Sequence, residues 1–202
     1  MIVGPAPRRR WVAAAAALLV VTLAGCGSAA SAPRSPDGRP PAPAAVSSSL
    51  FLSRSEPTRV IIPTLDLSVR TIELGLRPDG TMEVPANGGL AGWYSGAPTP
   101  GELGPAVITA HVRWKGERGA FADLQKLDPG DQIGVRRADG STVLFEVLRV
   151  EQYAKDRFPT DEVYGDIQAA GLRLITCGGD ADPETGDYPD NVVVYAGLVG
   201  SI

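Results

Sequence analysis

The sequence predicts an all-β domain that closes into a barrel of about eight strands, with short helices or helical turns in the connections. Glycine (24) and proline (18) are abundant among the 202 residues, whereas aromatic residues make up only 6%. This composition favours a turn-rich β domain over a helical bundle. Short apolar and β-branched runs recur along the chain, and no long stretch has apolar residues at helical spacing. Regularly spaced short strands of this kind indicate a closed or nearly closed barrel.

Residues 1–26 are predicted to be an export signal rather than part of the fold. Arg8–Arg10 form a positive segment and Trp11–Gly25 an apolar one, which is shorter than the roughly 20 residues of a spanning helix. The signal ends in Leu23–Cys26, which resembles the bacterial lipobox, where cleavage precedes a cysteine that receives lipid. Cys26 is therefore the lipidation candidate. The alternative is an ordinary signal peptide or a short membrane anchor with an incidental cysteine.

A linker and then one domain are expected after the signal. Residues 27–56 are rich in proline, serine and alanine, and such a segment cannot bury enough apolar surface to offset the entropy of ordering. The short apolar run Leu50–Leu52 could dock on the domain. Residues 57–202 are long enough for a single domain with its own core.

The predicted strands are short runs rich in apolar and β-branched residues, bounded by turn-forming residues. They are Arg59–Ile62, Val69–Leu74, Thr81–Val84, Ala106–Ala110, Gln132–Arg136, Thr142–Gln152, Leu172–Thr176 and Asn191–Leu198. The dipeptides Asp79-Gly80 and Asp139-Gly140 lie between such runs and predict hairpin turns. Ala120–Leu127 and Glu162–Ala170 could each form a short helix or helical turn.

The charge pattern excludes some partners. Lys and Arg total 19 against 23 Asp and Glu, and no basic patch is interleaved with aromatic residues, so no nucleic acid partner is expected. An acidic segment follows Cys177, between Asp180 and Asp190, but its spacing does not match a calcium-binding loop. It is interpreted as a solvated loop, and no metal or cofactor is expected.

The only histidine, His111, and the only cysteine after the signal, Cys177, each end an apolar run. A thiol becomes a useful nucleophile when a neighbouring imidazole stabilises its thiolate. Gly178 and Gly179 follow the cysteine, allow unusual backbone angles and could offer amide groups to an oxyanion. Taken singly, each residue could instead be structural, because free cysteines are commonly buried. Their joint placement at strand ends favours a catalytic pair, provided that the fold brings the two ends to one rim.

A cation for the reaction intermediate is less obvious in the sequence. Arg173 precedes Cys177 by four residues, and strand alternation places both on one face, so Arg173 could line the same groove. The alternative is a strand-edge arginine paired with a surface carboxylate.

The domain resembles the sortases, cysteine transpeptidases of the Gram-positive cell surface, and most of all their actinobacterial class F group. The resemblance spans nearly all of 57–202. It rests on motifs at Ile61–Pro63, Leu74–Leu76, Asp79–Met82, Val84-Pro85, Gly92–Tyr94, Pro100-Gly101, Gly104–Ala106, Ala110–Val112, Lys155–Thr160, Leu172–Gly179 and Asp190–Ala196.

The resemblance implies an eight-stranded barrel in which Cys177 is the nucleophile and His111 the acid/base. It implies cleavage of a C-terminal Leu-Pro-x-Thr-Gly-like (LPxTG-like) sorting signal through a thioacyl enzyme, which an amine, commonly of peptidoglycan, resolves. The expected partners are surface proteins that carry such signals. A monomer held at the outer face of the membrane by an N-terminal lipid or anchor is expected.

One departure from the family leaves alternatives open. Many sortases place an arginine on the strand after the cysteine loop, and Tyr188–Asn191 contains none. Arg173 or Arg157 could supply the charge, or Asn191 could substitute by hydrogen bonding, with Gly178 as a further oxyanion candidate. The alternative functions are a peptide hydrolase of the same chemistry and a non-catalytic peptide-binding lipoprotein.

Overall fold

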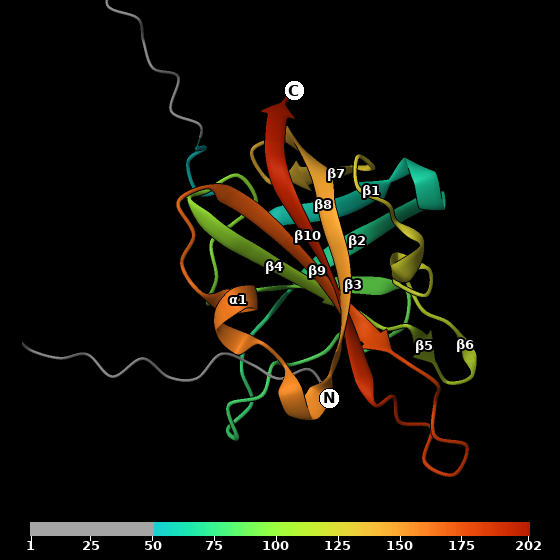
Figure 1. Cartoon of the computed structure of the whole chain (residues 1–202). Coiled ribbons are helices and arrows are strands. Elements are labelled where there is room, and N and C mark those ends of the chain that lie inside the picture. The colour runs from blue at the N-terminus through green and yellow to red at the C-terminus, as the bar shows by residue number, and fades with distance from the viewer. Residues whose placement is uncertain (1–50) are drawn as a thin grey trace, which may run out of the picture. The chain divides into compact units, whose positions relative to one another are not determined.

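The computed structural model describes residues 51–202, which form a closed eight-stranded barrel (Figure 1). The strands follow one another round the barrel in the order β1-β2-β3-β4-β9-β10-β8-β7. Pairs β2·β3 and β4·β9 are parallel and the other pairs are antiparallel. The predicted fold class is therefore confirmed. The barrel strands are β1 (Pro57–Ile62), β2 (Leu67–Leu74), β3 (Leu90–Tyr94), β4 (Gly104–Ala110), β7 (Gln132–Arg137), β8 (Thr142–Ala154), β9 (Ala170–Gly178) and β10 (Asp190–Ser201).

One strand prediction is wrong. Thr81–Val84 is not a barrel strand, since Met82 makes only an isolated bridge to Leu76. The third barrel strand is β3, which lies further along the chain. Its sequence is poor in β-branched residues and contains Gly92, a residue that weakens strands. Gly92 is needed there because the Leu74 side chain lies 2.0 Å from where a Cβ atom would be.

The short elements largely follow the sequence. Leu124–Lys126 forms a 3-10 turn, η2, inside the predicted range, and α1 (Thr160–Tyr164) begins earlier and ends sooner than predicted. The Asp139-Gly140 turn joins β7 to β8, as expected, with Gly140 at a φ of 89°. The remaining short elements are the 3-10 turns η1 (Pro63–Leu65) and η3 (Lys155–Arg157) and the small hairpin of β5 (Arg113–Trp114) and β6 (Glu117–Arg118).

Strands β4, β9 and β10 carry apolar side chains on both faces. Alternate residues, such as Ile108 and Leu174, fill the barrel interior. The residues between them, such as Val107 and Ile175, form a second cluster on the outer face. Met82 and Val163 cover this outer cluster, from the β2–β3 connection and from α1. The chain therefore has a buried apolar layer outside the barrel, and the candidate site lies at its edge.

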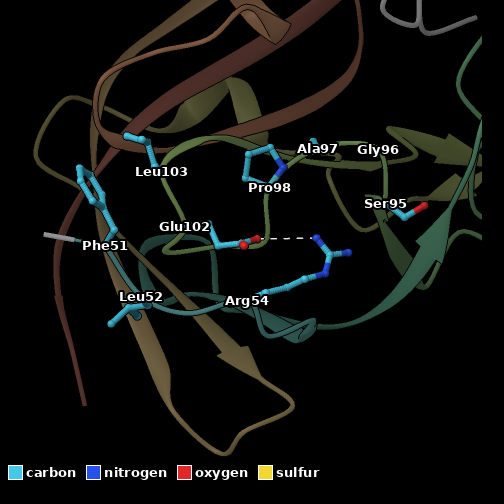
Figure 2. A pocket seen from close by; sticks show the side chains of 9 residues that line it. All are labelled: Phe51, Leu52, Arg54, Ser95, Gly96, Ala97, Pro98, Glu102 and Leu103. Atoms are coloured by element: carbon cyan, nitrogen blue, oxygen red, sulfur yellow. Dashed lines mark ion pairs between the residues drawn. The ribbon is translucent and has the colours of Figure 1, made fainter. Parts of the chain in front are cut away.

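The residues that precede β1 pack on the barrel. The Leu52 amide donates to Gly101 (2.8 Å), and the Arg54 guanidinium lies 5.2 Å from the Trp93 ring and 3.7 Å from Glu102. Figure 2 shows Arg54 pointing at Glu102 across a pocket of about 540 Å³. The predicted signal with Cys26, and the linker as far as residue 50, lie outside the described residues. No helix within 51–202 is both long and apolar enough to cross a membrane.

Candidate active site

Strands β4 and β9 bring His111 and Cys177 to neighbouring positions. The two strands pair in parallel from Gly104↔Ala170 to Thr109↔Ile175, with a constant separation of 66 positions in the sequence. His111 and Cys177 have the same separation and follow the last pair by two residues. Since strand side chains repeat every two residues, both project from the face that carries Thr109. Neighbouring strands lie about 4.8 Å apart, so the two side chains begin at adjacent backbone sites.

Two buried threonines fix this register where the ladder ends. The Thr109 hydroxyl donates to the Ile175 carbonyl at 3.0 Å, and the Thr176 hydroxyl donates to the Ala110 carbonyl at 2.9 Å. Each bond joins the two strands immediately before the candidate residues. Such bonds contribute about 1 kcal/mol each, and they also limit sliding of one strand against the other.

The His111 ring is held from two sides. Its Nε2 lies 2.8 Å from the Pro85 carbonyl oxygen, which can only accept a hydrogen bond. Nε2 therefore carries a hydrogen, and Nδ1 is the nitrogen left to exchange a proton. The Trp114 ring lies 4.7 Å from the imidazole, tilted by 42°. Gly119 passes so close that a Cβ there would lie 2.1 Å from the His111 carbonyl oxygen.

Cys177 is a free, partly exposed thiol near the end of β9. Gly178 follows it, and a Cβ at this position would lie 2.7 Å from Val192 Cγ2. Gly179 then adopts a φ of 80°, which side-chain-bearing residues rarely take. The two glycines thus let the chain leave the strand sharply, with the thiol at the rim.

His111 and Cys177 line one pocket of about 260 Å³. Met82 and Val84 give it apolar walls, and Arg77 is also among the residues that line it. Thr109 and Ala110 complete the lining. Arg77 was not among the residues predicted from the sequence. The only signal was the Asp79-Gly80 turn, which folds this connection back on itself.

The sortase-domain model matches residues 60–199 of the chain. This chain belongs to the sortase family. Sortases are cysteine transpeptidases, and the one cysteine and the one histidine within residues 51–202 line the same pocket. A comparison with curated proteins gives no match.

Solved sortases share the fold. Sortase C-1 from Actinomyces oris superposes with a TM-score of 0.57 at 20% identity, covering 70% of this chain and 73% of that one. Streptococcus agalactiae sortase C1, in complex with MTSET, gives 0.55 at 20% identity, covering 75% and 72%. Sortase C1 of GBS Pilus Island 1 gives 0.52 at 21% identity, covering 70% of this chain and 64% of that chain. This sortase therefore spans less than two thirds of the last of these.

Arg173 does not line the pocket of this sortase. It lies on the face of Cys177, as alternation predicts, but four residues along a strand is about 13 Å. Its guanidinium lies 4.5 Å from the centre of the Tyr195 ring, while Arg149 lies 3.6 Å from the same ring. Burial lowers the pKa of Arg173 from its ordinary value. The structure thus holds Arg173 in a packing cluster around Tyr195.

The other candidates from the sequence also lie outside the pocket lining. Arg157 is exposed in η3, 3.8 Å from Asp156. Asn191 lies directly opposite Cys177 in the β9–β10 ladder. Its side chain is fully buried, and neither amide atom has a hydrogen-bond partner among the described residues.

The acidic loop is organised by its own backbone. Asp182 accepts hydrogen bonds from the amides of Thr185 and Glu184, and these bonds lower the pKa of its carboxyl. Within residues 51–202, no three His, Cys, Asp or Glu side chains gather as metal ligands would.

Proposed function

We propose that this sortase is a cell-surface transpeptidase that cleaves an LPxTG-like sorting signal and transfers it to an amine of peptidoglycan. The observation that carries the proposal is the register of β4 and β9, whose constant separation extends to His111 and Cys177. A thiol and an imidazole in one pocket suit acyl transfer through a covalent intermediate. The apolar walls from Met82 and Val84 suit the leucine and proline of such a signal.

The first half of the reaction forms a thioester. The Cys177 thiolate attacks the threonyl carbonyl carbon, and the electron pair of the carbonyl bond moves to its oxygen. When the tetrahedral intermediate collapses, the carbon–nitrogen bond to glycine breaks. The leaving nitrogen takes a proton from the His111 imidazolium at Nδ1, because Nε2 is engaged with Pro85.

The second half regenerates the enzyme. An incoming amine attacks the thioester carbon and gives a proton to the neutral imidazole of His111. The carbon–sulfur bond then breaks, and its electron pair returns to Cys177 as the thiolate. Water could take the place of the amine, which would make the same site a peptide hydrolase.

Several finer assignments belong to this proposal. Membership of the class F group rests on the sequence motifs alone, whereas the solved structures compared above are sortases C. The export signal, a lipid on Cys26 and a Pro/Ser/Ala-rich linker would hold a monomeric domain at the outer face of the membrane. The roles of Asn191 as a hydrogen-bond donor and of Gly178 as an oxyanion donor are also part of it, whereas Arg157 is exposed and lies outside the pocket lining.

Product analysis tests the proposal. The full chain in detergent is incubated with a library of LPxTG-like peptides, with and without an amine such as triglycine, and products are weighed by mass spectrometry. We expect cleavage between threonine and glycine and a peptide–amine conjugate, both absent in Cys177→Ala. If cleavage gives the free peptide acid as its only product, even at a high concentration of the amine, the result would favour the hydrolase. Tight peptide binding without cleavage, equal in both proteins, would favour a non-catalytic binding module.

A further inference from the structure

The pocket contains a cation that the sequence motifs do not provide. Tyr188–Asn191 lacks an arginine, yet Arg77 lines the pocket beside His111 and Cys177. We propose that Arg77, from the connection between β2 and β3, supplies the positive charge that binds the oxyanion formed during acyl transfer. This inference rests on the proposed function and assigns a further catalytic residue to the same site.

A closed turn positions Arg77. Its amide donates to the Thr81 carbonyl at 2.8 Å, and the Gly80 amide donates to the Arg77 carbonyl at 2.9 Å. Asp79 accepts from both the amide (2.9 Å) and the hydroxyl (2.6 Å) of Thr81. These bonds fold residues 77–81 into a compact loop with Arg77 at its start.

The turn is anchored at the edge of the pocket. Leu76 and Met82 form a bridge on either side of the loop, and Met82 is 1% exposed within the outer apolar cluster. Behind the bridge, Gly75 donates to the Glu83 carboxylate at 2.8 Å and accepts from the Glu83 amide at 3.1 Å. The buried methionine and the paired backbone therefore fix where the Arg77 side chain begins.

The guanidinium of Arg77 is available to a substrate. Within the described part of the chain it has no ion pair or hydrogen bond of its own. Asp79 is the nearby carboxylate, but it is engaged with Thr81. Hydrogen bonds from Thr81 are the main cause of the lowered pKa of the Asp79 carboxyl, and the positive charge of Arg77 lowers that pKa further. Arg77 thus interacts with Asp79 through space without being held by it.

Two other arginines, Arg173 and Arg113, are engaged elsewhere. Arg173 lies on the Tyr195 ring, and Arg113 donates to the Gly116 carbonyl at 2.6 Å. A guanidinium offers several N–H donors in a planar fork, which suits an oxygen that gains negative charge. As the Cys177 thiolate attacks, negative charge moves from sulfur to the carbonyl oxygen. Arg77 would donate hydrogen bonds to that oxygen, and none of its own bonds breaks.

Two measurements on the full chain test the inference. The variants are Arg77→Ala and Arg77→Lys, with Arg136→Ala as the matched control. Arg136 is an exposed arginine on β7 with no side-chain partner among the described residues. The first measurement is the single-turnover rate of thioacyl formation on Cys177 with a cleaved peptide. Loss of an oxyanion donor typically lowers such rates by about 10²–10³. We expect that loss in Arg77→Ala, partial recovery in Arg77→Lys and no change in Arg136→Ala.

The second measurement needs no peptide substrate. It is the ratio of Cys177 alkylation rates by iodoacetate, which is anionic, and iodoacetamide, which is neutral. A positive charge about 5 Å away in water favours the anion by about fourfold. The ratio of the iodoacetate rate to the iodoacetamide rate should fall by that factor in Arg77→Ala. It should stay unchanged in Arg77→Lys and in Arg136→Ala. In the wild type it should decrease as salt is added, because salt screens the charge.

The outcomes separate the two proposals. If no peptide acylates the wild type but the alkylation ratio falls in Arg77→Ala, the proposed function is wrong. The inference that Arg77 places a positive charge at the pocket would then still be supported. An unchanged ratio in Arg77→Ala overturns the inference, even if acylation falls, because the residue would then act through folding. Unchanged acylation in Arg77→Ala overturns it as well.

Discussion

Cys177 and His111 could be predicted to share one pocket, because each is a rare residue at the end of an apolar run. Arg77 could not, because its place depends on a connection that folds across the outside of the barrel. Sequence alternation put Arg173 on the correct face, but the distance along the strand and the Tyr195 ring hold it away from the pocket. Alternation predicts a face, whereas a site also requires a position along it.

Asn191 should be a residue that costs stability. A buried amide without partners costs about 1–3 kcal/mol, and leucine has the same branched arrangement of side-chain heavy atoms without polar groups. We expect Asn191→Leu to keep or raise the midpoint of thermal unfolding while lowering thioacyl formation. Asn191→Ala, which also leaves a cavity, should lower the midpoint. A large loss of stability in Asn191→Leu, measured by urea unfolding, would mean that the amide is paired.

Gly178 should tolerate no side chain unless Val192 is shortened. A Cβ at Gly178 would lie 2.7 Å from Val192 Cγ2, and overpacking of this kind costs about 1–3 kcal/mol. We expect Gly178→Ala to be destabilised by that amount in urea unfolding, and Gly178→Ala with Val192→Ala to show a coupling that offsets part of it. Additive effects in this double-mutant cycle would contradict the contact.

At the scale of elements, most strands followed from local sequence because apolar runs and turn dipeptides coincide with them. Strand β3 could not be predicted in this way, because its sequence has low strand propensity. Its Gly92 is instead required by the close packing of the Leu74 side chain. Thr81–Val84 has the apolar character of a strand, but the Met82 side chain in this segment covers the outer face of the barrel instead. Local propensity cannot tell a strand from an apolar covering segment.

The threonine bonds between β4 and β9 should matter more to the site than exposed bonds of the same kind. We expect Thr109→Val and Thr176→Val each to lose about 1–3 kcal/mol of unfolding free energy, because a buried carbonyl loses a donor. Thioacyl formation should also slow, since the end of the ladder is less constrained. Thr58→Val is the control, because its hydroxyl bonds to Arg136 at an exposed position. Equal losses in all three would argue against a special role for the buried pair.

At the scale of the whole molecule, several exposed carboxylates tie connections to the barrel and should make stability fall in acid. The amide of Asp128 and the hydroxyl of Thr64 lower the pKa of Asp131, and Ser141 does the same for Asp139. Groups with a depressed folded-state pKa contribute stability above their unfolded value, near 3.9, and lose it as pH falls through the folded value. We expect the midpoint of thermal unfolding to drop below about pH 4, with a shallower slope in Asp131→Asn and Asp139→Asn. An unchanged slope in the double variant would contradict these bonds.

The barrel as a whole explains why two residues far apart in sequence share one pocket. Parallel pairing of β4 and β9 sets the offset, and apolar layers on both faces hold those strands rigid. The most direct test is the intact mass of the full chain after mixing with an LPxTG-like peptide. We expect a peptide acyl group on Cys177 that disappears when an amine is added and never forms in Cys177→Ala. The absence of any such adduct across a broad peptide library would contradict it.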